Sequence, residues 1–215
     1  MFKDLGRWAP LTGVVFAILF FVGAQISGNT PDSDASPQKV VSYYLGHRGG
    51  QHASFYLIAY SIIFGLFFAA ALRSYLRARS SEDGSIALGF AGMVVLGVSA
   101  AVVAGMSFAA ADVPGKISPV AEQAISVLSN DVFVGMLIGT CVFMIGFGLA
   151  IVRSAAAVLP RWLGWVALPL GVIAATPIGW FVLIFALPLW SLIVSVLMLI
   201  RQEAPATTAA APASG

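Results

Sequence analysis

Two histidines and three carboxylates of this chain could together form a metal site or a proton-transfer site. His47 and His52 are the only histidines, and both lie in the ten residues YYLGHRGGQH between two apolar runs. They are five residues apart with Gly49-Gly50 between them, so they do not share one helical face as a His-x-x-x-His pair does. The histidine spacing therefore specifies no metal, and we expect no cofactor.

Carboxylates near the ends of the apolar runs could complete such a site in space. Asp112 follows one run and Asp131 precedes the next, so both are expected at the bilayer edge where His52 enters. Carboxylates there are ordinarily solvated or start a helix, which makes a metal or proton site the less favoured interpretation. The candidate polar cluster comprises His47, His52, Asp112, Glu122 and Asp131.

The composition is that of an integral membrane protein. Of the 215 residues, 60% are apolar and only 9% are charged, whereas a soluble domain has about 25% charged residues. The net charge of +2 is small. The basic residues are not clustered with aromatic ones, so nothing supports nucleic-acid binding. The single Cys141 cannot form an intrachain disulfide.

Six apolar segments predict an all-α membrane protein, a bundle of six transmembrane helices in one domain over residues 1–201. A helix needs about 20 apolar residues to cross a bilayer core of about 30 Å. The last run is too long for one span, and it divides best at Thr176–Gly179 because proline disfavours a helical conformation in the preceding residue. A less favoured alternative has five spans with one long kinked helix at the end. The predicted spans are residues 10–26, 53–72, 86–111, 132–152, 162–175 and 179–200.

The distribution of basic residues predicts that both termini are cytoplasmic. With six spans, eight of the eleven lysines and arginines fall in inner segments and three in outer segments. The first run is longer than a typical signal-peptide core, so we interpret it as a retained anchor. Residues 202–215 are mostly Ala, Pro and Thr, and we expect this tail to be disordered.

Two outer loops carry the same helix-start signal. Ser36-Pro37 and Ser118-Pro119 each place a serine at the N-cap and a proline at the first helical position. Glu122 adds an acidic residue to the first turn of the helix that Pro119 begins. After Ser36 we expect a short amphipathic helix on the outer membrane face. This helix is expected to end at Gly49-Gly50, before the next span begins. Asn130-Asp131 is interpreted as the start of the fourth span. The two short helices would form an ordered cap over the bundle.

Small residues at four-residue spacing in the third and fourth spans predict close packing of helices. They could form a dimer interface or pack within one bundle. The second interpretation is favoured because a six-helix bundle needs such faces internally. The predicted packing residues are Gly97, Ala101, Gly105, Ala109, Gly135 and Gly139.

No Asp, Glu, Lys or Arg lies well inside any predicted span. Charges at that depth usually mark an ion path, a proton relay or a catalytic site. Their absence disfavours a proton-driven pump and an intramembrane hydrolase. Serine and threonine side chains in the spans have no histidine or carboxylate nearby in sequence, so we expect them to bond helical carbonyls and predict no catalytic residue.

A series of short motifs runs along nearly the whole chain apart from the tail: Thr30-Pro31-Asp32, Asp34-Ala35-Ser36, Tyr43-Tyr44, His47-Arg48, Leu72-Arg73, Leu76-Arg77 and Pro160-Arg161-Trp162-Leu163-Gly164-Trp165. In these motifs the chain resembles a large group of uncharacterised small bacterial membrane proteins, common in high-GC Gram-positive genomes. The resemblance implies a multi-pass protein of the bacterial plasma membrane. It implies no activity.

Three function classes stay open. The favoured one is a non-catalytic accessory or scaffolding component whose interior is filled by side chains and whose partners are the lipid bilayer and a second copy or another membrane protein. The second is a transporter-like protein that binds a small solute or lipid in a polar-lined cavity under the outer loops. The third is a membrane enzyme, which requires His47 or His52 within reach of one of the outer carboxylates.

Overall fold

The computed structural model describes residues 8–28, 30–154 and 158–203, and all regular secondary structure in these ranges is helical. The predicted disordered tail therefore lies almost entirely outside the described residues. The helices are α2 (Leu11–Ser27), α3 (Pro37–Arg77), α4 (Asp83–Asp112), α5 (Pro119–Arg153), α6 (Arg161–Ala174), α7 (Gly179–Phe181), the π-helix η1 (Val182–Ala186) and α8 (Leu187–Glu203).

The last three of these elements follow one another without a gap and form a single apolar stretch over Gly179–Arg201. A break separates this stretch from α6, as predicted: α6 ends at Ala174, and the Gly179 N–H donates to the Thr176 carbonyl at 2.8 Å. The structure therefore fits six helical segments, and the alternative with one long kinked helix is wrong. The π-turn of η1 ends two residues before Pro188, which has no N–H to continue the regular α-helical pattern.

Four helices are long and apolar enough to cross a membrane, namely α3, α4, α5 and Gly179–Arg201, and α2 and α6 are shorter apolar helices. Large apolar side chains cover the outside of the bundle. Val98 is 62% exposed, Ile138 52% and Val172 61%. An apolar exterior of this kind is unfavourable in water and matches the hydrocarbon of a bilayer. These features indicate a multi-pass membrane protein.

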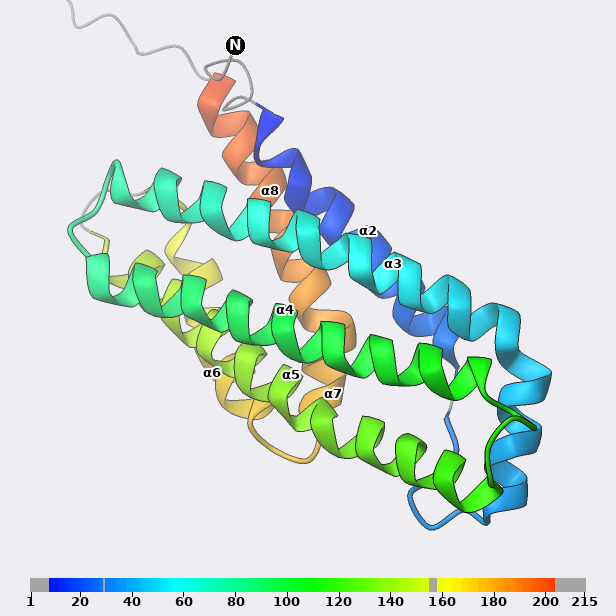
Figure 1. Cartoon of the computed structure of the whole chain (residues 1–215). Coiled ribbons are helices and arrows are strands. Elements are labelled where there is room, and N and C mark those ends of the chain that lie inside the picture. The colour runs from blue at the N-terminus through cyan, green and yellow to red at the C-terminus, as the bar shows by residue number, and fades with distance from the viewer. Residues whose placement is uncertain (1–7, 29, 155–157, 204–215) are drawn as a thin grey trace, which may run out of the picture.

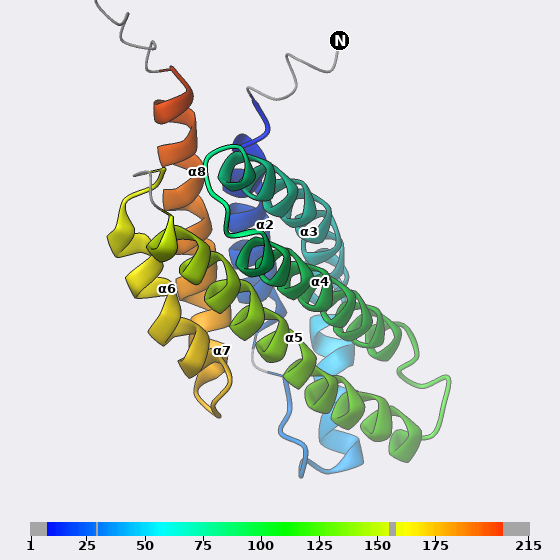
Figure 2. The same ribbon diagram turned by 90° about the vertical axis from the view of Figure 1, so that its left-hand side faces the viewer.

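The connections between helices lie at the two ends of the bundle. The start of α2, the end of α8 and the α3–α4 connection lie at one end in both views (Figures 1 and 2). The segments 28–36, 113–118 and 175–178 lie at the other end. This alternation is what an even number of crossings requires. The second end is the predicted outer side, and residues 28–36 are called the outer loop below.

Three helices are much longer than a bilayer crossing requires. The 41 residues of α3 correspond to a helix about 60 Å long, twice the bilayer core. The predicted separate helix after Ser36 is wrong, because residues 37–52 form the first turns of α3, here called its outer extension. Pro37 does begin the helix, but Gly49-Gly50 do not end it, although α3 bends in its N-terminal part (Figure 1). A glycine costs a helix only about 1 kcal/mol, which packing readily offsets.

The same correction applies to α5. Pro119 begins this helix, with the Ser118 hydroxyl accepting from the Ala121 N–H, and the helix continues unbroken to Arg153. The predicted helix start at Asn130-Asp131 is therefore wrong. An apolar cluster lies between the outer parts of α3 and α5 and the end of α4. Packing around this cluster stabilises α3 and α5 as helices beyond the predicted membrane spans. The cluster, called the outer cluster below, comprises Ala35, Val40, Tyr44, Ala110 and Ala111.

Glycines allow the backbones of α4 and α5 to touch. A Cβ atom built on Gly146 would lie 2.6 Å from the Cα of Gly89, and one built on Gly92 would lie 2.7 Å from the Cα of Phe143. Side chains cannot approach backbone that closely, so only glycine fits this interface. It anchors the main core, in which Phe143, Phe147 and Met144 are fully buried.

The predicted packing residues occupy several environments. On α5, Gly139 lies against the backbone of Leu96 and Gly135 against the side chain of Ser99. On α4, Gly97 lies against Ile62 of α3, whereas a Cβ built on Gly105 would meet no atom of the described chain within 4 Å. Ala101 and Ala109 are exposed on the same helix. Of the α4 residues of this set, Gly97 therefore packs within the chain, whereas Ala101, Gly105 and Ala109 contribute little to that packing.

Candidate functional site

The two histidines make local contacts within and beside α3. His47 is exposed, its Nδ1 lies 2.9 Å from the Tyr43 carbonyl oxygen, and its ring stacks on that of Tyr43. The His52 ring stacks on Phe108 of α4 with centroids 4.4 Å apart. Among the described residues, no group of three or more His, Cys, Asp or Glu side chains could hold a metal ion.

The outer carboxylates also separate in space. Asp112 accepts a hydrogen bond from Arg48 and forms an ion pair with Lys116 at 3.5 Å. The hydrogen bond from Arg48, and then the charge of Lys116, hold the pKa of Asp112 below its ordinary value. Asp131 is exposed on α5, while Glu122 on the same helix is fully buried. The Asp112 carboxylate is thus paired with Arg48 and Lys116, and not with a histidine as the third function class requires.

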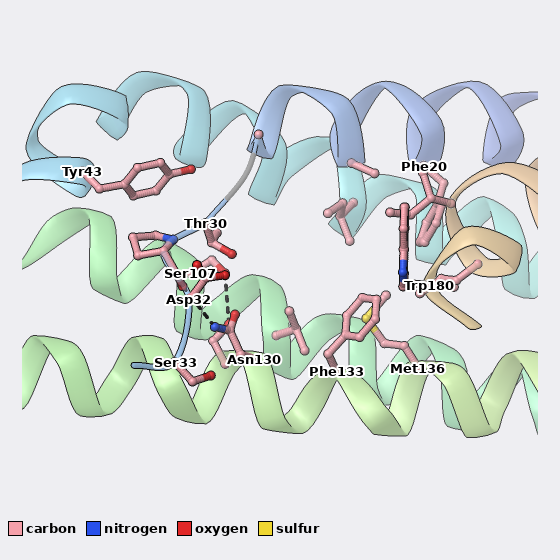
Figure 3. A pocket seen from close by; sticks show the side chains of 18 of the residues that line it. Phe20, Thr30, Asp32, Ser33, Tyr43, Ser107, Asn130, Phe133, Met136 and Trp180 are labelled. Atoms are coloured by element: carbon pink, nitrogen blue, oxygen red, sulfur yellow. Dashed lines mark hydrogen bonds between the residues drawn. The ribbon is translucent and has the colours of Figure 1, made fainter. Parts of the chain in front are cut away.

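A cavity of about 930 Å³ opens beneath the outer loop, between α2, α3, α4, α5, α7 and η1. Its size lies at the upper end of the roughly 300–1,000 Å³ that small-molecule sites occupy. Figure 3 shows side chains from the loop and from several helices around this space, with polar groups gathered at one end and aromatic and methionine side chains at the other. The cavity is thus divided into a polar end and an apolar end.

The polar end lies next to the outer loop. Thr30, Asp32 and Ser33 come from the loop, and Ser107 and Ser129 come from α4 and α5 with their hydroxyl oxygens 3.2 Å apart. The cavity lining contains one acidic group, Asp32, and one basic group, Lys39. The charged side chains balance, so they suit a headgroup without net charge.

The apolar end lies deeper in the bundle. Figure 3 shows Phe20 of α2, Phe133 and Met136 of α5, and Trp180 of α7 at this end. Val103 of α4 and Leu183 of η1 add further apolar side chains to the cavity lining. Phe20 and Leu183 belong to the main hydrophobic core. Methionine and aromatic side chains adapt to apolar ligands of varied shape. This end can therefore accept a hydrocarbon chain.

Side chains of α5 hold the outer loop in place over the polar end. The Asn130 amide donates to the Pro31 carbonyl at 3.3 Å (Figure 3), and the Gln123 amide donates to the Ala35 carbonyl at 2.7 Å. Gly28, with a φ of 65°, lets the chain turn away from the end of α2 into the loop. The loop, here also called the roof of the cavity, is thus positioned by α5.

The cavity residues differ from those that the sequence singled out. Ser107 was expected to bond its own helix, and Asn130 was expected to start one. In the structure both line the cavity. The one signal in the sequence that could have indicated these cavity residues is their position near the outer ends of two neighbouring spans. That position specifies neither the angle between α4 and α5 nor the path of the outer loop.

Comparison of the chain with family models, with curated proteins and with solved structures finds no match.

Proposed function

We propose that this chain is an integral membrane protein that binds a small amphiphilic molecule, such as a single-chain lipid, in the cavity beneath the outer loop. The observation that carries this proposal is the segregation of the cavity lining into a polar and an apolar end. Such a lining matches a ligand with a compact headgroup and a hydrocarbon tail. An accessory protein with a filled interior needs no such space, so the cavity favours the second function class over the first.

The headgroup that fits best is zwitterionic or uncharged. Asp32 and Lys39 supply one charge of each sign, and the remaining polar groups are hydroxyls and amides. A strongly anionic or cationic headgroup would leave one of these charges opposed by a like charge. We therefore take a single-chain phosphocholine as the probe for this site.

Photolabelling with a single-chain phosphocholine that carries a diazirine on its acyl chain tests the proposal. After irradiation in lipid nanodiscs, we expect mass spectrometry to find label on Phe20, Met136 or Leu183, which line the apolar end. Label found only on bilayer-facing side chains such as Ile138 and Val172 would reject the cavity as the binding site.

We further propose that the chain crosses a bacterial plasma membrane six times with both termini in the cytoplasm. Basic residues connect the described inner segments to one another. Arg77 at the end of α3 pairs with Asp83 at the start of α4 at 2.8 Å, and Arg201 of α8 donates to the Val158 carbonyl at 2.7 Å. An arginine-rich inner side accords with the positive-inside rule. The orientation places the cavity at the outer face.

Cysteine labelling in intact cells tests this orientation. In a Cys141→Ser background, a membrane-impermeant maleimide is expected to label Lys116→Cys on the outer side and not Ala78→Cys at the end of α3. Both positions are exposed, so both should react after the cells are lysed. Labelling of Ala78→Cys, but not of Lys116→Cys, in intact cells would mean that the chain is inserted the other way round.

A further inference from the structure

Glu122 is the only acidic side chain that is fully buried among the described residues, at 0% exposure. Neither of its carboxyl oxygens has a hydrogen-bond partner in the described chain. Buried polar groups in proteins are almost always hydrogen-bonded, and an unpaired buried charge is far more costly than an unpaired neutral group. The conformation described here therefore favours the protonated, neutral form of this carboxyl.

Among the described residues, no cation forms an ion pair with Glu122. It lies in the first turns of α5, beyond the predicted span, and the neighbouring Tyr44 of the outer cluster shares a hydrogen bond with Ser126, one turn further along α5. Burial raises the pKa of Glu122 above its ordinary value. Burial also raises the pKa of Tyr44, and the charge of Glu122 adds to that shift.

The charged and titratable groups of the elements around Glu122 are Asp32 and Asp34 of the outer loop, Lys39, Tyr43, Tyr44, His47 and Arg48 of α3, and Asp112 and Lys116 at the end of α4. The three groups Arg48, Asp112 and Lys116 pair with one another at exposed positions. Desolvation alone accounts for the raised pKa of Glu122, so none of these groups offsets a negative charge on it.

A stripe of polar side chains leads from Glu122 to the cavity. Ser126 and Ser129 follow it at positions four and seven residues on, which places all three on one face of α5. Ser126 is bonded to Tyr44, and Ser129 contacts Ser107 in the cavity lining. The buried carboxyl and the binding cavity thus share one helix face.

The same part of α5 holds the roof of the cavity. Gln123, the next residue after Glu122, donates to the Ala35 carbonyl, and Asn130 donates to the Pro31 carbonyl. Ionisation of Glu122 would require water or a cation to reach it, because a bare buried carboxylate is unstable. Either event would disturb the packing around Glu122, and the hydrogen bonds that hold the roof come from the same part of α5.

We propose that Glu122 is a proton-binding site coupled to the cavity, so that the protein binds its amphiphile with the roof closed when Glu122 is protonated and releases it when Glu122 ionises. This inference rests on the proposed function. The sign follows from the burial: the raised pKa means that the closed form is most stable below the ordinary pKa of glutamate, and that it loses stability as the pH rises through the raised pKa.

Infrared spectroscopy of the purified full-length protein tests the proton site without any ligand. The wild-type protein is expected to show the carbonyl stretching band of a protonated carboxyl group, which disappears on titration to alkaline pH. Glu122→Gln should lack this band. Asp131→Asn, which removes an exposed carboxyl from the same helix, should retain it. A band that persists in Glu122→Gln would overturn the assignment.

Binding of the single-chain phosphocholine probe across the same pH range tests the coupling. Wild type is expected to lose affinity at least about tenfold as the pH rises through the pKa of Glu122, and Glu122→Gln should keep its affinity throughout. Equal pH dependence in the two proteins overturns the coupling. Absence of binding at every pH in both proteins overturns the proposed function and the coupling with it, and the infrared band then still decides the proton site.

Discussion

Replacement of Gly146 by leucine is expected to lower the free energy of unfolding by at least about 3 kcal/mol, the upper part of the usual range for an overpacked core. A Cβ atom at this position would lie 2.6 Å from the Cα of Gly89 on α4. Backbone cannot rotate aside as a flexible side chain does, so the two helices would have to separate along their whole contact. Thermal unfolding of the purified protein in detergent, followed by tryptophan fluorescence, measures the loss.

Gly105→Leu is the matched control for this substitution. It makes the same change on α4, at a position where an added Cβ meets no atom of the described chain within 4 Å. Leucine has the higher helix propensity, so we expect no loss of stability. Equal losses at positions 146 and 105, or no loss at 146, would contradict the close contact of α4 and α5. A Gly105→Leu protein that is stable but changes its oligomeric state would support the less favoured interpretation of these small residues, a dimer interface on α4.

Val103→Trp is expected to weaken binding of the single-chain phosphocholine probe at least about tenfold, or about 1.4 kcal/mol. Val103 lines the cavity from α4 and packs against the edge of the main core. The larger indole would occupy space that the hydrocarbon chain of the ligand needs. Equilibrium binding of the radiolabelled probe to protein in nanodiscs measures the change.

The neighbouring residue supplies the control for the cavity variant. Val102 has the same side chain on the same helix, but it is 41% exposed and does not line the cavity. Val102→Trp should therefore bind the probe as wild type does. Thermal unfolding of both variants establishes that each is folded. Equal loss of binding in both variants would show that the effect comes from the bilayer surface of α4 and not from the cavity.

Helix ends that depend on local chemistry could be predicted from the sequence. Ser36-Pro37 and Ser118-Pro119 start α3 and α5 as expected, and the break at Thr176–Gly179 separates α6 from the helix that follows. Both helix starts are set by a proline that fixes its own φ. The Ser118 hydroxyl also accepts a capping hydrogen bond, whereas the Ser36 side chain makes none. Such preferences act over a few residues and need no knowledge of the rest of the fold.

Helix ends that depend on tertiary packing could not be predicted. Gly49-Gly50 have the composition of a helix break, yet α3 continues through them because Val40 and Tyr44 before them are buried against α4 and α5. Asn130 has the composition of a helix start, yet it lies inside α5 and bonds the outer loop. In both cases contacts with distant residues outweigh a local preference of about 1 kcal/mol.

The candidate site was only partly accessible from the sequence. Glu122 was selected because it lies in an outer loop among other polar residues, but an acid in a first helical turn is usually solvated. Its burial depends on the outer extension of α3, which the sequence did not predict. The cavity arises because six helical elements and the outer loop leave space between them, and its volume depends on helix crossing angles that no single segment encodes.

The most direct test of the cavity as a ligand site is native mass spectrometry of the protein released from nanodiscs that contain the single-chain phosphocholine. A site of this size predicts one tightly held molecule per chain in wild type and in Val102→Trp, and none in Val103→Trp. Equal occupancy in all three proteins, or no retained molecule in any of them, would contradict amphiphile binding in the cavity.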